Sequence, residues 1–190
     1  MMDCFEAEKV ISQHRNNAIV VTAETCCREW PQLSSTPLDL PSRTAMGKAA
    51  SFGLGLALAL PARKVIVLDA DGSLLMSLGS LVTIANMAPP NLIHFVFENG
   101  VYRTTGGQPI PNAGKVSFTG LAKASGYPYT YEFDKLDSLE KTIETIMNQT
   151  KLTFVCLKVQ TRRDPSTLPI PSAAQTIARY SEFGKTAGLS

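Results

Sequence analysis

Residues 64–74 read KVIVLDADGSL, and this stretch decides the fold class. Residues 64–69 are rich in β-branched side chains and nearly continuous in apolar ones, the pattern of a strand covered on both faces of its sheet. Two carboxylates, Asp69 and Asp71, and then Gly72 follow before a segment with helical spacing begins. A buried strand that leads directly into a helix is the repeating unit of an α/β fold with a parallel sheet.

The same alternation continues along the chain. Further strands are predicted in short apolar runs, at residues 18–23, 92–97 and 153–159, with a weaker one at 127–133. Helical spacing separates them, at residues 46–60, 73–86, 118–125 and 138–149. Loops are predicted at residues 30–42, 100–114 and 164–172, and residues 173–190 are either a helix or a tail. The sequence thus predicts an α/β fold, a mostly parallel sheet with helices on both faces, with ligands at the carboxyl ends of its strands.

Length and composition narrow the class of protein. A chain of 190 residues with 44 % hydrophobic and 18 % charged residues is expected to form a single domain, residues 1–190. The net charge of +2 includes no dense basic run, so no nucleic acid partner is expected. Residues 52–62, the longest apolar stretch, are too few to span a membrane, and residues 1–9 lack the features of a signal peptide. We therefore expect a cytoplasmic protein that does not bind membranes.

The four cysteines give little functional information by their spacing. Cys4, Cys26, Cys27 and Cys156 form no C-x-x-C pair. A disulfide framework and a zinc or iron–sulfur site are therefore not expected. The adjacent pair Cys26-Cys27 has no role that the sequence assigns.

Polar residues at two strand ends predict a binding site for phosphate and metal. Asp69, Asp71 and Gly72 stand where a strand passes into a helix, a corner that brings backbone N–H groups and a carboxylate to a diphosphate and its Mg²⁺. Asn99 follows the next predicted strand, so its side chain is expected beside Asp71 at the same edge of the sheet. The alternative is that the two aspartates only cap the helix.

These residues also resemble a known family motif. Asp71-Gly72-Ser73, followed after 25 residues by Asn99-Gly100, is similar to the thiamine diphosphate motif, which is usually Gly-Asp-Gly, a spacer and Asn. Ala70 stands where that motif usually has its first glycine. The resemblance extends to residues 44–47 (TAMG) and 102–109 (YRTTGGQP) and covers most of the chain. It is strongest with the thiamine-diphosphate-binding domain of sulfopyruvate and phosphonopyruvate decarboxylases.

The resemblance implies thiamine diphosphate and Mg²⁺ as cofactors and assigns roles to individual residues. The metal ligands it implies are Asp71, Asn99 and the carbonyl of Val101. The residues it implies for the organic cofactor are Thr25, Thr44, Met46, Gly72, Ser73, Asn99 and Tyr102. Met46 would lie under the cofactor and bend it, and the Thr44 carbonyl would accept from its 4′-amino group. The loop residues Arg103, Thr104 and Gln108 are candidates for the substrate, since a guanidinium suits a sulfonate or phosphonate.

The function that the resemblance implies is that of a β-type subunit of a split 2-oxo acid decarboxylase. Sulfopyruvate, which would yield sulfoacetaldehyde and CO₂, is the preferred small anionic substrate; phosphonopyruvate decarboxylase and an acetolactate-synthase-like carboligase are alternatives. No catalytic residue is assigned in this chain, because the activating glutamate of the family lies on a pyrimidine-binding domain. That domain is expected on an α-type partner subunit, and residues 46–60, rich in Gly and Ala, are expected to join two copies of this chain.

Other interpretations of the same residues explain less of the sequence. Residues 68–74 also resemble the Asp-x-Asp-Gly-Thr-Leu motif of haloacid-dehalogenase-type phosphatases, with Asp69 as nucleophile and Asp71 as acid. That motif normally ends the first strand of its fold, and it accounts for neither Asn99 nor residues 104–108. A dinucleotide site at Gly53-x-Gly55 lacks the third glycine. His94 lies inside an apolar strand and is predicted to be a core residue.

Overall fold

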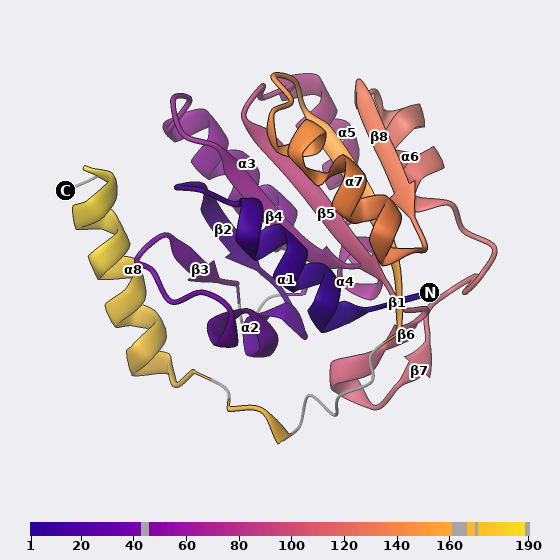
Figure 1. The fold of residues 1–190 in the computed structure, drawn as a ribbon, viewed down its shortest axis with the longest axis horizontal. Coiled ribbons are helices and arrows are strands. Elements are labelled where there is room, and N and C mark those ends of the chain that lie inside the picture. The colour runs from indigo at the N-terminus through magenta and orange to yellow at the C-terminus, as the bar shows by residue number, and fades with distance from the viewer. Residues whose placement is uncertain (43–45, 161–166, 170, 189–190) are drawn as a thin grey trace.

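The structure is a computed structural model that describes residues 1–42, 46–160, 167–169 and 171–188 (Figure 1). Its main sheet has the strands β1 (Met2–Asp3), β2 (Ile19–Thr22), β3 (Asp39–Pro41), β4 (Val65–Ala70), β5 (Leu92–Glu98), β8 (Tyr129–Phe133) and β9 (Thr153–Gln160). The strand order is β1-β9-β5-β4-β2-β3, with β8 also paired to β9, and every described pair in this sheet is parallel. The prediction of a mostly parallel sheet is confirmed.

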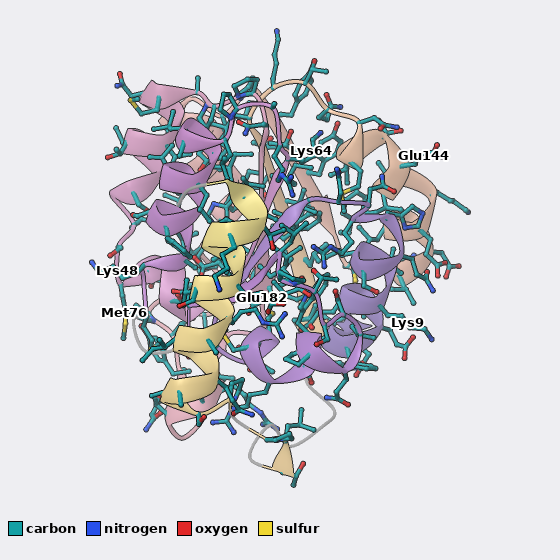
Figure 2. All side chains as sticks on the ribbon, turned by 90° about the vertical axis from the view of Figure 1, so that its left-hand side faces the viewer. Lys9, Lys48, Lys64, Met76, Glu144 and Glu182 are labelled. Atoms are coloured by element: carbon teal, nitrogen blue, oxygen red, sulfur yellow. The ribbon has the colours of Figure 1, made fainter. Side chains whose placement is uncertain are left out.

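Helices cover both faces of the sheet. They are α1 (Cys4–His14), α2 (Cys26–Glu29), α3 (Ala49–Ala59), α4 (Asp71–Leu75), α5 (Ser80–Met87), α6 (Phe118–Ser125), α7 (Leu136–Met147) and α8 (Ala173–Ala187). Figure 1 shows α1 and α7 in front of the sheet and α3, α5 and α6 behind it. Figure 2 shows the layers from the side, with Lys9 and Glu144 on one outer surface and Lys48 and Met76 on the other. Each face has its own apolar core, so the strands are buried on both sides.

The centre of the sheet explains why the site residues meet. β4 lies between β2 and β5, and Ala70 pairs in register with Phe97. The two strands therefore end at nearly the same level, which places Asp71 beside Asn99. On the rear face, a Cβ at Gly53 would lie 2.2 Å from Cγ2 of Val67, so α3 packs closely on β4 only because residue 53 has no side chain.

Several elements differ from the sequence-based prediction. The helix predicted at residues 73–86 is two helices, α4 and α5, separated by a turn at residues 76–79. The sequence analysis predicts no helix or strand before residue 18, where the structure has β1 and α1. The predicted loop 30–42 contains a 3₁₀ helix η1 (Trp30–Gln32) and β3, and the loop 100–114 contains the antiparallel hairpin β6 (Val101–Tyr102) and β7 (Gln108–Pro109) with a 3₁₀ turn η2 (Arg103–Thr105). These strands are two or three residues long, too short to show periodicity.

The C-terminal segment is the helix α8, which begins with a capping box formed by Ser172 and Gln175. α8 packs beside the edge strand β3, where the Tyr180 hydroxyl donates to the Pro41 carbonyl over 2.9 Å. Within the described part of the chain, no helix combines the length and the apolar character that crossing a bilayer requires.

Candidate functional site

A small cavity of about 20 Å³, partly open to the surface, lies at the carboxyl ends of β2, β4 and β5. Most of the residues that the sequence predicted for the site line it, namely Thr25, Met46, Gly72, Ser73, Asn99, Val101, Tyr102, Arg103 and Thr104. They come from segments far apart in the sequence, and the parallel order of the three strands brings them together. A larger cavity lies between α8 and η1, and none of the predicted site residues lines it.

Asp71, the first residue of α4, ties the end of β4 to the end of β5. Its Oδ2 accepts from the backbone N–H groups of Asn99 (3.0 Å) and Gly100 (2.7 Å), and its Oδ1 accepts from the N–H of Gly72 (2.8 Å). The side chain is fully buried, and this burial raises the pKa of Asp71 to about 6 although the three N–H donors favour the charged form. A divalent cation bound beside the carboxylate would offset that desolvation.

The turn after β5 supplies further oxygen atoms next to Asp71. The Asn99 side-chain oxygen accepts from the N–H of Val101 over 2.8 Å, and Gly100 between them has a φ of 77°, which favours glycine. Asp71 and Asn99 are therefore joined to the backbone of Gly100 and Val101 in one hydrogen-bonded turn. A carboxylate and a side-chain amide are hard oxygen donors, the type that Mg²⁺ prefers, so the residues present fit that metal.

Gly72 and Ser73 hold the walls of the cavity in place. A Cβ at Gly72 would lie 2.6 Å from Cδ1 and Cε1 of Tyr102, so the tyrosine ring covers the start of α4 only because residue 72 is glycine. The Ser73 hydroxyl accepts from the N–H of Gly47 over 3.0 Å and so fixes the segment that carries Met46. Both residues therefore shape the cavity as well as lining it.

The η2 turn brings two of the three predicted substrate residues to the cavity. Arg103 and Thr104 line it, whereas Gln108 is exposed and does not. The Gln108 amide lies against Gly106 instead, where a Cβ would be 2.9 Å from its nitrogen. The predicted residue Thr44 lies outside the described residues.

Glu24 lines the cavity, although the sequence analysis did not select it. Its Oε2 accepts from the Thr104 hydroxyl over 2.7 Å, which ties the turn after β2 to η2. Its φ of 51° is unusual for a residue with a side chain. The signal that could have found it is the one used for Asp71, a carboxylate directly after a buried strand.

Asp69 faces the core and not the cavity. It is fully buried, its Oδ1 accepts from the N–H of Ala70, and its Oδ2 lies 3.6 Å from Nε2 of His94. A phosphatase nucleophile must reach its substrate, so this position gives no support to the phosphatase interpretation. His94 is fully buried, 3.5 Å from the Tyr127 hydroxyl and edge-on to Phe154, and is the core residue that the sequence predicted.

This chain is similar in sequence to named decarboxylases. The chain is 39 % identical over 146 residues to a phosphonopyruvate decarboxylase of Streptomyces viridochromogenes. This match covers 77 % of this chain and 36 % of that protein. It is 40 % identical over 114 residues to the sulfopyruvate decarboxylase subunit beta of Methanocaldococcus jannaschii, with 60 % of each chain covered. The chain thus spans about a third of the length of the first relative and 60 % of the length of the second.

A solved structure has a similar fold, and a family model matches the sequence. The thiamine diphosphate-dependent 4-hydroxybenzoylformate decarboxylase of Rhodococcus jostii superposes with a TM-score of 0.71 at 18 % identity, over 84 % of this chain and 33 % of that one. This likeness shows a shared fold. The profile of the family described as thiamine pyrophosphate enzyme, C-terminal TPP binding domain, matches residues 32–157, where pyrophosphate is another name for diphosphate. The chain therefore belongs to the thiamine pyrophosphate enzymes, as a C-terminal-type cofactor-binding domain.

Proposed function

We propose that this chain is the thiamine-diphosphate- and Mg²⁺-binding β-type subunit of a 2-oxo acid decarboxylase, with sulfopyruvate as its substrate. The observation that carries the proposal is the cavity where residues after three parallel strands meet. Its support from relatives is the identity of about 40 % to sulfopyruvate decarboxylase beta subunits. Residues 1–190 would act as one domain.

In this proposal the oxygen atoms around Asp71 hold the metal. Asp71 and Asn99 would coordinate Mg²⁺ through their side chains and Val101 through its carbonyl, and the metal would carry the diphosphate. Thr25, Gly72 and Ser73 would contact the diphosphate, and Met46 would lie under the cofactor rings. When bound, thiamine diphosphate supplies a nucleophilic carbon for the 2-oxo group and an electron sink for loss of CO₂.

The hairpin β6–β7 and its η2 turn would close and shape the substrate side of the cavity. The Tyr102 ring lies against Gly72 at the start of α4. Arg103 lines the cavity, and its forked donors would bind a sulfonate or phosphonate. Thr104, held by Glu24, fixes the position of this turn. This chain would thus bind and orient the cofactor and the anionic end of the substrate.

The activating glutamate would come from an α-type subunit that carries the pyrimidine-binding domain. Three relatives are named as beta subunits of sulfopyruvate decarboxylase, a name that implies a second kind of subunit in those enzymes. We also propose that α3 joins two copies of this chain. Its outer side exposes Gly55 and Leu58, and Val82 of the neighbouring α5 is exposed as well. A small-residue apolar surface of this kind favours close helix contacts.

Phosphonopyruvate is the second candidate substrate, because the match to a phosphonopyruvate decarboxylase covers 77 % of this chain. A carboligase that passes the product to a second 2-oxo acid is a further alternative. The same cavity would serve each reaction, since all three need the metal and the diphosphate. The identity of the acid therefore has to come from turnover.

An assay of the chain with and without its partner tests the proposal. With thiamine diphosphate and Mg²⁺, the chain alone should be nearly inactive, and the chain reconstituted with the polypeptide that co-purifies with it should convert sulfopyruvate to sulfoacetaldehyde and CO₂. Robust turnover by the chain alone would refute the split site. Preferential turnover of phosphonopyruvate, or a carboligation product, would replace sulfopyruvate decarboxylation with the corresponding alternative.

A further inference from the structure

Glu24 adopts a backbone conformation that suits glycine better than a residue with a side chain. Its φ of 51° lies in the left-handed region, which is unfavourable for a residue with a Cβ. Strain of this kind persists where the surrounding structure enforces it, and it is common at binding sites. Glu24 follows β2 and lines the cavity at the strand ends. A carboxylate is therefore held at this cavity at a cost to the fold.

The Glu24 side chain is bonded to the η2 turn, which carries the residue proposed to hold the anionic end of the substrate. Its Oε2 accepts from the Thr104 hydroxyl over 2.7 Å. Arg103 precedes Thr104 on the same turn and also lines the cavity. The Glu24 carboxylate is therefore fixed to the residue next to Arg103.

Glu24 and Arg103 are the only charged residues among the described residues that line this cavity. The rest of the described lining is apolar or polar without charge. Asp71 is not part of this lining, and its charge is assigned to Mg²⁺ in the proposed function. The side chains that line the cavity therefore contribute one positive and one negative charge.

These two charges act on a bound anion in opposite directions. An arginine alone attracts an anion in proportion to the charge of that anion, so it favours a dianion over a monoanion. A nearby carboxylate repels the dianion twice as strongly as the monoanion, which offsets that preference. The cost of removing the anion from water then decides, and this cost is larger for the dianion.

We infer that Glu24 is a specificity-determining residue that selects a monoanionic sulfonate over a dianionic phosphonate at the end of the substrate that Arg103 binds. A sulfonate carries one negative charge, whereas a phosphonate, like a phosphate ester, carries close to two above neutral pH. The inference rests on the proposed function, because it concerns the acid that the same cavity accepts. It gives the preference for sulfopyruvate a physical cause in this chain.

Glu24→Gln tests the inference, because the amide keeps an oxygen that can accept from the Thr104 hydroxyl but removes the negative charge. The probes are sulfoacetate and phosphonoacetate, titrated calorimetrically above neutral pH into the chain with its co-purifying partner, thiamine diphosphate and Mg²⁺. The unmodified complex should bind sulfoacetate more tightly. In Glu24→Gln the affinity should rise about threefold for sulfoacetate and about tenfold for phosphonoacetate, because the repulsion that is removed grows with the charge of the anion.

Two further variants separate the charge of Glu24 from its hydrogen bond. Glu140→Gln removes the same charge at an exposed position of α7 and should change neither affinity. Thr104→Val removes the hydrogen bond but keeps the carboxylate, so it should change the affinities for both anions by the same factor. Thermal unfolding of all three variants checks that they fold.

Turnover by the same complex provides an independent measurement. In Glu24→Gln the ratio of kcat/KM for sulfopyruvate to that for phosphonopyruvate should fall about threefold, through KM and not kcat. Equal effects of Glu24→Gln on the two anions, or tighter binding of phosphonoacetate by the unmodified complex, would overturn the inference and leave the decarboxylase proposal intact. A complex that turns over neither acid but shows the charge-dependent shift would support the inference and refute that proposal. A complex that binds neither anion would overturn the inference.

Discussion

Asp71 and Glu8 are both fully buried carboxyls, but different neighbours surround them and their pKa values differ. Asp71 accepts three backbone N–H bonds beside an open cavity, and its pKa is raised only to about 6. Glu8 has a thiol and a second carboxyl as neighbours, and its pKa is raised well above the ordinary value. Backbone donors keep Asp71 ionisable near neutral pH for a hard cation, whereas burial and the neighbouring Glu29 carboxyl favour the protonated form of Glu8.

The largest expected effect is the loss of cofactor binding in Asp71→Ala. This change removes the buried carboxylate that links the ends of β4 and β5. We expect the Mg²⁺-dependent affinity for thiamine diphosphate to fall about 100-fold or more, as measured by calorimetric titration. Asp137→Ala, at an exposed position in the first turn of α7, is the control and should bind normally. Unchanged binding in Asp71→Ala would show that the ligand assignment is wrong.

A smaller loss is expected from Gly72→Ala. The added methyl group would lie 2.6 Å from the Tyr102 ring and push it off the start of α4. We expect a loss of about 1–3 kcal/mol in the free energy of cofactor binding or of unfolding, the usual range for overpacking. Denaturant unfolding and cofactor titration separate the two. Gly79→Ala, where a Cβ meets nothing within 4 Å, should change neither, and equal effects at both glycines would contradict the packing argument.

The affinity for Mg²⁺ and cofactor should depend on pH through Asp71. Its pKa of about 6 in the folded chain exceeds the ordinary 3.8, so its protonated form contributes stability at low pH that is lost as the pH rises through about 6. Metal binding needs the charged form and follows the opposite direction. Below pH 6 we expect the affinity to fall up to about tenfold per pH unit. A profile that stays flat down to pH 5 would rule out Asp71 as the titrating ligand.

The smallest effect is expected at Glu8. Glu8→Met replaces a fully buried carboxyl that lies beside a second carboxyl with an apolar side chain, so the melting temperature should stay the same or rise slightly. Thermal unfolding at neutral pH measures this change. A fall of several degrees would mean that the hydrogen bonds of Glu8 stabilise the fold.

The contrast between Asp71 and Glu8 also shows which parts of the structure could be predicted from the sequence. β4 and β5 are long apolar runs, so their parallel pairing and the meeting of Asp71 with Asn99 were predictable from pattern and topology. β1 and β3 are too short for such a signal, and their pairing depends on the folded sheet. Gln108 was predicted for the site from its motif, but the turn at Gly106 leaves it exposed.

The surroundings of Glu8 were not predictable in the same way. Cys26 and Glu29 are far from Glu8 in the sequence, and only the tertiary structure brings them to its carboxyl. Glu24 was predictable from the sequence, because it follows the strand predicted at residues 18–23 just as Asp71 follows its own strand.

The most direct test of the central claim is thermal unfolding of this chain with thiamine diphosphate, in Mg²⁺ and in EDTA, alone and with its co-purifying partner. We predict that the cofactor raises the melting temperature in Mg²⁺ and has no effect in EDTA, since a ligand that binds only the folded state stabilises it. The absence of a Mg²⁺-dependent shift, even with the partner present, would contradict the assignment of the cavity at the ends of β2, β4 and β5 to the cofactor.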